Sequence, residues 1–307
     1  MEMKSLGLLV LTLLLAPLFP AIIQKVKAFF AGKKGPPLLI KYSTLAKLFK
    51  KGSVYSTSTT FVFKLGPLVS CAGALMVLLF FPVAGGTPLL SFHGDAIVLF
   101  YVMGLGRFFT IAAALDTASP FQGMGAAREA FFGTLAEASI FAILILFYRM
   151  TGALSFAEYF TGPTPISLSG PAGALLLLVI VALFMVLLTE NSRVPVDDPA
   201  THLELTMIHE VMILDHSGPD LALIQLGAFF KLFFYAAFVF LIVFPLQQGW
   251  GLLNVPLFFG GVALVYVTVG VFESVMARFK MSLVPKFILT SLILTIFAAI
   301  LTLELVK

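Results

Sequence analysis

The sequence is short of the residues from which most catalytic and redox sites are built. Of its 307 residues only one is cysteine, one is tryptophan and four are histidine. Because Cys71 is the sole cysteine, an internal disulfide or a cysteine-ligated cluster is excluded. Cys71 lies within an apolar run, so we interpret it as a buried structural thiol. No phosphate-binding glycine loop or nucleophile triad is present. The chain thus has no identifiable cofactor site, which argues against redox chemistry by this chain alone.

Charge is scarce as well. Only 11% of the residues are charged, whereas 60% are hydrophobic, including 33 phenylalanines. Apolar stretches of about 20 residues recur, and together they contain more apolar surface than a soluble domain of this length could bury. These features predict an all-α, polytopic membrane protein with about eight transmembrane helices. The predicted spans cover residues 6–30, 65–83, 96–115, 131–148, 172–189, 221–244, 252–272 and 286–305.

The basic residues fall mostly on one side of the predicted membrane. The first connection and its flanks hold nine lysines, whereas the opposite side shows only Lys4, Arg149 and Lys307. By the positive-inside rule, the lysine-rich side is cytoplasmic and both termini lie outside. We interpret residues 1–307 as a single integral membrane domain. Its predicted cytoplasmic connections lie near residues 31–64, 116–130, 190–220 and 273–285.

Acidic residues concentrate in one of these connections. Seven of the 15 aspartates and glutamates lie between Glu190 and Asp220. Carboxylates beside a membrane are costly unless something uses them, so we look for function here first. Glu190 and Arg193 stand three residues apart, a spacing at which two side chains can pair at the end of the fifth span.

Prolines divide this acidic connection into two parts. Pro195 and Pro199 bracket Asp197 and Asp198, which predicts a rigid turn that presents both carboxylates. The apolar spacing over residues 201–214 then predicts a helix.

Histidines recur every seven residues in the same connection, at His202, His209 and His216. Helical metal sites use ligands three or four residues apart, so this spacing favours protonatable or interface histidines over metal ligands.

Four further charges lie within or at the ends of predicted spans. Arg107 and Lys231 interrupt apolar runs, where a cation costs about 2.5–3.5 kcal/mol, so each is expected to face a carboxylate or a water-filled interior. The alternative is a buried ion pair that only fixes helix register. Glu129 and Glu137 are eight residues apart and share one helix face. Glu137 is the deeper and the better candidate for proton exchange, whereas Glu129 could be a residue at the membrane interface.

An amphipathic segment follows the first span. Residues 38–51 mix leucine, isoleucine and phenylalanine with four lysines, which is typical of a helix lying in the headgroup plane. A helix that lines a cavity, or one that docks a soluble partner, would fit the same pattern.

Three local patterns together resemble one family. The segment from Gly32 to Pro37 with Gln24 before it, the segment from Phe121 to Glu137, and Arg193-Val-Pro-Val-Asp-Asp-Pro-Ala-Thr-His-Leu-Glu-Leu205 resemble motifs of the respiratory complex I subunit 1 family. Their order and the eight-span topology agree with that family over essentially the whole chain. Val196 and Thr201 depart from the quinone-reducing members, as does Lys231. With Val196 and Thr201 the third motif resembles that of formate hydrogenlyase and other group 4 membrane-bound [NiFe]-hydrogenases.

The resemblance implies a non-catalytic membrane-anchor subunit of a hydrogenase complex in the cytoplasmic membrane of a prokaryote. The [NiFe] centre and iron–sulfur clusters would lie in partners, namely the hydrogenase large and small subunits and an iron–sulfur protein, with antiporter-like membrane subunits alongside. No nucleic acid is expected as a partner. The residues expected in an acidic funnel for protons or sodium are Glu137, Glu190, Asp197, Asp198, Glu204, Glu210, Arg193, Arg107, Lys231 and Glu129. The residues expected to dock the partner are Lys33, Lys34, Lys47, Lys50, Lys51 and Arg128.

Three alternatives remain open from the sequence. A quinone-binding subunit of an NADH:quinone oxidoreductase-type complex would use the same loops to line a quinone tunnel. A stand-alone, ion-coupled secondary transporter would use the acidic segment as a substrate site, although the sequence shows no convincing internal repeat. A purely structural anchor would use its charges only for docking.

Overall fold

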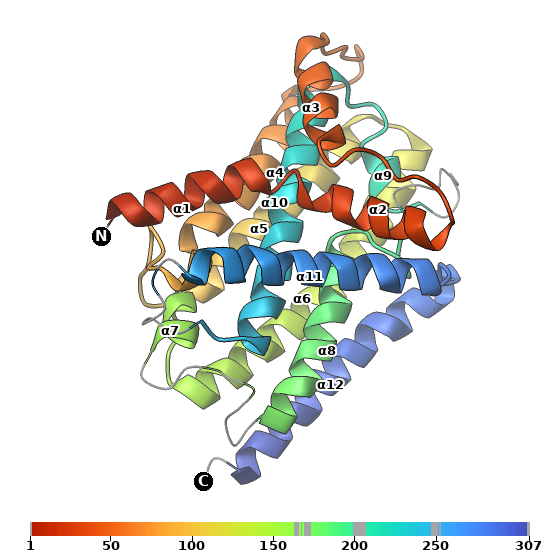
Figure 1. The fold of residues 1–307 in the computed structure, drawn as a ribbon. Helices are drawn as coiled ribbons and strands as arrows, with labels where there is room; N and C mark the ends of the chain where they lie inside the picture. Colours follow the sequence, from red (N-terminus) through yellow and green to blue (C-terminus); the bar gives the residue numbers. More distant parts are fainter. Residues whose placement is uncertain are drawn as a thin grey trace.

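The computed structural model describes residues 2–162, 166, 168, 173–198, 207–246, 251 and 253–305. Within these residues every regular element is a helix (Figure 1). The α-helices are α1 (Glu2–Leu15), α2 (Phe19–Phe30), α3 (Ile40–Lys50), α4 (Phe61–Phe80), α5 (Asp95–Asp116), α6 (Pro120–Thr151), α7 (Phe156–Thr161), α8 (Gly173–Glu190), α9 (His209–Met212), α10 (Gly218–Val243), α11 (Asn254–Val275) and α12 (Val284–Leu305), and the short 3-10 helices are η1 (Val83–Gly85) and η3 (Met281–Leu283).

The described residues contain eight helical segments long and apolar enough to cross a membrane, which confirms the predicted fold class. The first segment joins α1 to α2 through a turn around Pro17, because proline cannot continue the hydrogen bonding of a helix. The largest difference is α6, which begins at Pro120 rather than near residue 131. A helix of 32 residues is about 48 Å long, so α6 is longer than the bilayer core of about 30 Å requires.

Helix α10 forms the centre of the bundle. It packs against α3, α4, α8 and α11, and all of its aromatic side chains are buried. Phe234 and Phe238 contact Phe156 of α7 with ring centroids 5.8 and 4.8 Å apart, which closes the core at the end away from α3. Figure 1 shows α10 running down from α3 through the bundle, with α11 crossing it and α12 along one edge.

Small residues allow α4, α5 and α10 to approach closely. The backbone of Gly106 on α5 lies against Ser70 of α4, and Gly227 of α10 lies against Cys71 of α4, where an added Cβ would come within 3.1 Å of the Cys71 Cα. Small residues at such crossings are how helices pack tightly in membranes. Cys71 is buried at this crossing, as expected for a structural thiol.

The segment that follows α8 is buried inside the bundle. Val194, Val196 and Ile208 are each no more than 5% exposed, and Val196 and Ile208 pack against α6 and α12. Irregular backbone at membrane depth is tolerated where it is buried in protein or lines a cavity. The predicted helix over 201–214 is described only from residue 207, and there it is limited to the single turn of α9.

The Asp197 carboxylate holds this segment in place. It accepts hydrogen bonds from the backbone N–H groups of Asp198, Ile208 and His209, at 2.9, 3.2 and 3.1 Å, and from Arg278 Nη2 at 2.8 Å. The side chain is buried, so these bonds replace its lost contact with water. Asp197 therefore fixes the turn that the prolines predict, with its carboxylate facing inward.

At the opposite end of the bundle, Asp95 has a similar role. Its carboxylate accepts from the Phe156 N–H at 2.6 Å, from Ser155 Oγ at 3.0 Å and from the Phe92 N–H at 3.2 Å. It thus joins the start of α5 to the start of α7 and is fully buried.

Helix α3 packs across the end of α10. Leu45 is buried against Ala222 and Phe229 of α10, and the Lys41 ammonium lies 5.9 Å from the centroid of the Phe229 ring. The Tyr42 hydroxyl donates to the carbonyl of Leu14 in α1. Lys47 and Lys50 lie on the exposed side. The amphipathic pattern thus reflects packing on one side of the helix and solvent or headgroups on the other.

His216 and Ser217, just before α10, contact α4 and the connection before α4. Its ring stacks on Phe63 with centroids 4.0 Å apart, and the adjacent Ser217 Oγ accepts from the Val54 N–H at 3.1 Å. Burial lowers the pKa of His216 to about 4, although Asp220 and Asp215 favour its charged form. His216 is therefore neutral at neutral pH.

Acidification should destabilise this junction. The pKa of His216 is 6.5 unfolded and about 4 folded, so the unfolded chain binds more protons between these values. The stability is complete above pH 6.5 and is lost as the pH falls towards 4, with a loss of at most about 3 kcal/mol. We expect His216→Phe to weaken the pH dependence of thermal unfolding between pH 7 and 4.5. His93→Phe, at an exposed histidine, should leave it unchanged; identical pH dependence in both variants would contradict this role.

Candidate functional site

Arg107 of α5 lies at the centre of a group of three glutamates. Its Nη2 donates to both oxygens of Glu190 at 2.6 Å, and its Nη1 lies 3.1 Å from Glu137. Its Nε lies 3.8 Å from Glu129. Glu129 and Glu137 come from one face of α6, as their spacing predicts, and Glu190 comes from the end of α8. Gly133 of α6 provides room, because a Cβ there would overlap Arg107 Nη1.

Lys231 of α10 completes this group, which we call the inner cluster (Arg107, Lys231, Glu129, Glu137 and Glu190). Its Nζ lies 2.8 Å from Glu190. The prediction that both cations within spans face carboxylates is confirmed. Two cations face three carboxylates, so the fully ionised cluster carries one excess negative charge.

A second group of charges, the outer cluster (Lys27, Arg193, Asp198 and Glu273), lies around the end of α11. Lys27 Nζ is 3.0 Å from Glu273 and 3.9 Å from Asp198, and Arg193 Nη1 is 3.5 Å from Glu273. The predicted pair of Glu190 and Arg193 is wrong, because each has another partner. Helix α8 ends at Glu190 and Ser192 has a φ of +52°, so helical spacing does not extend to Arg193.

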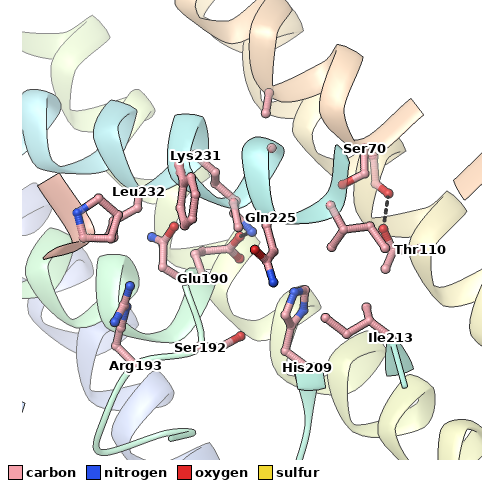
Figure 2. A pocket seen from close by; sticks show the side chains of 18 of the residues that line it. Ser70, Thr110, Glu190, Ser192, Arg193, His209, Ile213, Gln225, Lys231 and Leu232 are labelled. Atoms are coloured by element: carbon pink, nitrogen blue, oxygen red, sulfur yellow. Dashed lines mark hydrogen bonds and ion pairs between the residues drawn. The ribbon is translucent and has the colours of Figure 1, made fainter. Parts of the chain in front are cut away.

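Both clusters border a cavity of about 720 Å³. Figure 2 shows Glu190 and Lys231 pointing towards one another in the wall of this cavity. Gln225 of α10 and His209 of α9 lie beside them and line the same cavity. The rest of the wall is largely apolar and includes residues of α2, α4, α5 and α10. The cavity therefore has a charged wall and an apolar wall, and its volume is within the range of ligand sites.

Lys41 of α3 lines the same cavity. Burial lowers the pKa of its ammonium, and the nearby Arg193 lowers it further, whereas Glu210 opposes both effects. Lys41 and Glu210 are thus close enough to interact electrostatically at the side of the cavity near α3.

The remaining predicted site residues are distributed as follows. Asp197 contacts Arg278, and Glu204 lies outside the described residues. Arg128 donates to the carbonyl of Met207 at 2.9 Å, so it ties α6 to the buried segment. The proposed docking lysines, Lys33, Lys34, Lys47, Lys50 and Lys51, are all exposed. Across the described residues no group of three or more histidines, cysteines or carboxylates has a metal-binding arrangement.

Sequence reasoning missed Lys27, Glu273 and Arg278. Glu273 had a usable signal, because it lies near the end of the apolar seventh span and carboxylates in spans are rarely unpaired. Lys27 and Arg278 had none, since each resembles an ordinary basic residue at a span end. Only the packing of α2 against α11 brings Lys27 to Glu273.

Comparison with known proteins adds to this geometry. The family model described as NADH dehydrogenase matches residues 3–304, almost the whole chain. The chain belongs to the NADH dehydrogenase subunit 1 family. This confirms the resemblance found in the sequence motifs.

Within the NADH dehydrogenase subunit 1 family the chain is homologous to membrane subunits of hydrogenases and of complex I. Hydrogenase-4 component C of Escherichia coli is 30% identical over 71% of this chain and 67% of that protein. Formate hydrogenlyase subunit 4 of the same organism is 29% identical over 88% and 89%. An NADH-quinone oxidoreductase subunit of Pelagibacter ubique is 25% identical over 74% and 68%.

A solved structure has the same fold. It is a chain from the membrane-bound sulfane sulfur reductase, an archaeal respiratory membrane complex, and it matches with a TM-score of 0.82 at 20% identity, over 97% of this chain and 98% of that one.

Proposed function

We propose that this chain is the membrane-anchor subunit of a membrane-bound [NiFe]-hydrogenase of the formate hydrogenlyase type. In this function it docks the soluble hydrogenase module on its cytoplasmic side and couples the redox chemistry of that module to the movement of protons or sodium ions. The nickel and iron–sulfur centres would lie in the partner subunits.

The inner cluster carries the coupling part of this proposal. It contains one more carboxylate than cations, and it borders the cavity that reaches Lys41 and Glu210 near α3. A change of charge in a docked redox module would shift the proton affinity of such a cluster, because interactions between buried charges are only weakly screened. The cluster could then take up and release a proton with each redox cycle.

The surface near α3 supports the docking part. Lys47, Lys50 and Lys51 are exposed there, and Lys33 and Lys34 are exposed on the connection before α3. Homology to hydrogenase-4 component C and formate hydrogenlyase subunit 4 over two thirds or more of each protein favours a hydrogenase complex over a stand-alone transporter.

A quinone-binding subunit is the second candidate, and the cavity favours it. A space of about 720 Å³ with an apolar wall suits an amphiphilic ligand, and a subunit of an NADH-quinone oxidoreductase is a relative. The departure at Val196 does not bear on this choice, because its side chain is buried between α6 and α12 and does not line the cavity.

Purification of the tagged chain from its native membrane tests the proposal. We expect nickel-containing and iron–sulfur proteins to copurify, and hydrogenase activity of the complex to be unaffected by quinone analogues. Isolation of the chain alone would contradict the complex, and saturable inhibition by quinone analogues would favour the second candidate.

A further inference from the structure

Of the histidines that the structure describes, His209 alone lines the large cavity. Its side chain is half-buried, and Figure 2 shows it directed from α9 towards Gln225 of α10. Its ring makes no ion pair or hydrogen bond with another described residue. The other described histidines differ, because His93 is exposed near the start of α5 and His216 stacks on Phe63. His209 thus presents an unpaired imidazole to the cavity.

The backbone around His209 is held firmly in place. Its N–H donates to the Asp197 carboxylate at 3.1 Å, and Arg278 binds the same carboxylate at 2.8 Å. Helix α9 lies directly against α6, where Gly125 leaves room for it, since a Cβ at that position would overlap Val211 Cγ1. These contacts fix the backbone from which the ring extends and do not involve the ring itself.

The cavity brings His209 together with charged groups from two parts of the protein. Lys41 and Glu210 line it near α3, and Glu190 and Lys231 of the inner cluster line it as well. A volume of about 720 Å³ has space for roughly 20 water molecules at about 30 Å³ each, so water can connect these groups. The other charged residues in the wall are Lys27, Arg107, Glu129, Arg193 and Glu273.

We propose that the imidazole of His209 carries protons across this cavity, between the surface near α3 and the inner cluster. Histidine is the side chain that ordinarily titrates between about pH 5 and 8, so imidazole binds and releases protons readily at neutral pH. The ring accepts a proton from water on one nitrogen and then releases a proton to water or to a carboxylate. One N–H bond forms and one breaks, no electron is transferred, and the ring ends neutral. This inference rests on the proposed function, with the proton as the transported ion.

The outer cluster is less suited to this step. Lys27 and Arg193 are both bound to Glu273 in ion pairs, at 3.0 and 3.5 Å. A change of protonation in any of the three would leave a buried partner without its counter-charge, which is costly. His209 has no ion-pair partner among the described residues, so its protonation breaks no such contact.

His209→Ala with added imidazole tests the proton carrier. The variant keeps the backbone N–H that binds Asp197, and alanine favours a helix, so we expect the complex to assemble. It also adds space to a cavity that is already large enough for small ligands. The intact complex in proteoliposomes would be assayed for proton translocation per turnover with no addition, with imidazole and with pyrazole. Pyrazole has the shape of imidazole but does not bind a proton near neutral pH.

We expect His209→Ala to lose about 100-fold in translocation, the contribution of a positioned proton-transfer group, while activity with an artificial electron acceptor is retained. Imidazole should restore translocation and pyrazole should not. Each value would be compared with the wild type under the same addition, because neutral imidazole crosses membranes. His93→Ala, at the exposed histidine, should behave like the wild type in all three conditions. His209→Gln should lose translocation too, and it provides the test if the alanine variant does not assemble.

Several outcomes would overturn the role of His209. Normal translocation by His209→Ala or His209→Gln would do so, as would a loss that imidazole does not restore. Equal restoration by pyrazole would show that the ring only fills space. A wild-type complex that moves sodium but no protons would overturn this inference alone, whereas one that moves neither ion would overturn the coupling part of the proposed function.

Discussion

On the proposed function, Glu137→Gln is expected to abolish ion translocation while leaving the complex assembled and its hydrogenase activity with an artificial acceptor intact. Glu137 was expected to be the deeper of the two glutamates on α6, but at 36% it is more exposed than Glu129 at 15% and is the most exposed carboxylate of the inner cluster; its ion-pair partner is Arg107. Glutamine keeps the shape of the side chain but cannot bind or release a proton. Loss of a positioned proton-transfer group costs about 100-fold or more, so translocation should fall to background.

The measurement is proton or sodium uptake by proteoliposomes that contain the purified complex, relative to the turnover of the hydrogenase. Glu158→Gln is the matched control, because Glu158 is an exposed glutamate on α7, at the other end of the bundle. Normal translocation by Glu137→Gln would remove Glu137 from the path. Equal losses in both variants would indicate a general effect on the membrane subunit.

Arg107→Gln should prevent accumulation of the folded subunit. The change removes the partner shared by three carboxylates and leaves only Lys231 beside the buried Glu190. Removing one partner of a buried ion pair costs about 3–5 kcal/mol, a large share of a total stability of about 5–15 kcal/mol. The amount of subunit in washed membranes and the thermal unfolding midpoint of the complex measure the effect.

Arg107→Lys separates charge from geometry. The ammonium keeps the positive charge, but it cannot form the parallel hydrogen bonds that a guanidinium forms to several carboxylates. We expect this variant to assemble and to translocate poorly. Arg149→Gln, at an exposed arginine near the end of α6, should behave like the wild type. Normal levels of Arg107→Gln would show that the cluster contributes little to stability.

Local properties of the sequence account for the parts that were predicted correctly. Hydropathy defines the spans because each helix must satisfy its own backbone in the apolar layer. The helical repeat places Glu129 and Glu137 on one face of α6, and both reach Arg107. The cost of a cation in a span also required partners for Arg107 and Lys231, without identifying them.

Predictions failed where a local rule was extended past the end of a helix. Glu190 and Arg193 have helical spacing in the sequence, but the backbone leaves the helix between them at Ser192.

The acidic connection was predicted to lie on the cytoplasmic side of the membrane, and its position relative to the membrane stays a prediction. In the structure Asp197 is buried within it, because four hydrogen bonds satisfy its carboxylate.

The sequence by itself determined that the chain is a helical membrane protein of this family, with charges in its spans that need partners. Only the tertiary structure decided which charges meet. Glu190 reaches Arg107, 83 residues away, because α8 ends beside the middle of α5 and α10. Lys27 reaches Glu273 because α2 packs along α11. Helical periodicity relates only residues a few positions apart, whereas these contacts depend on how small residues let separate helices approach and on where each helix ends.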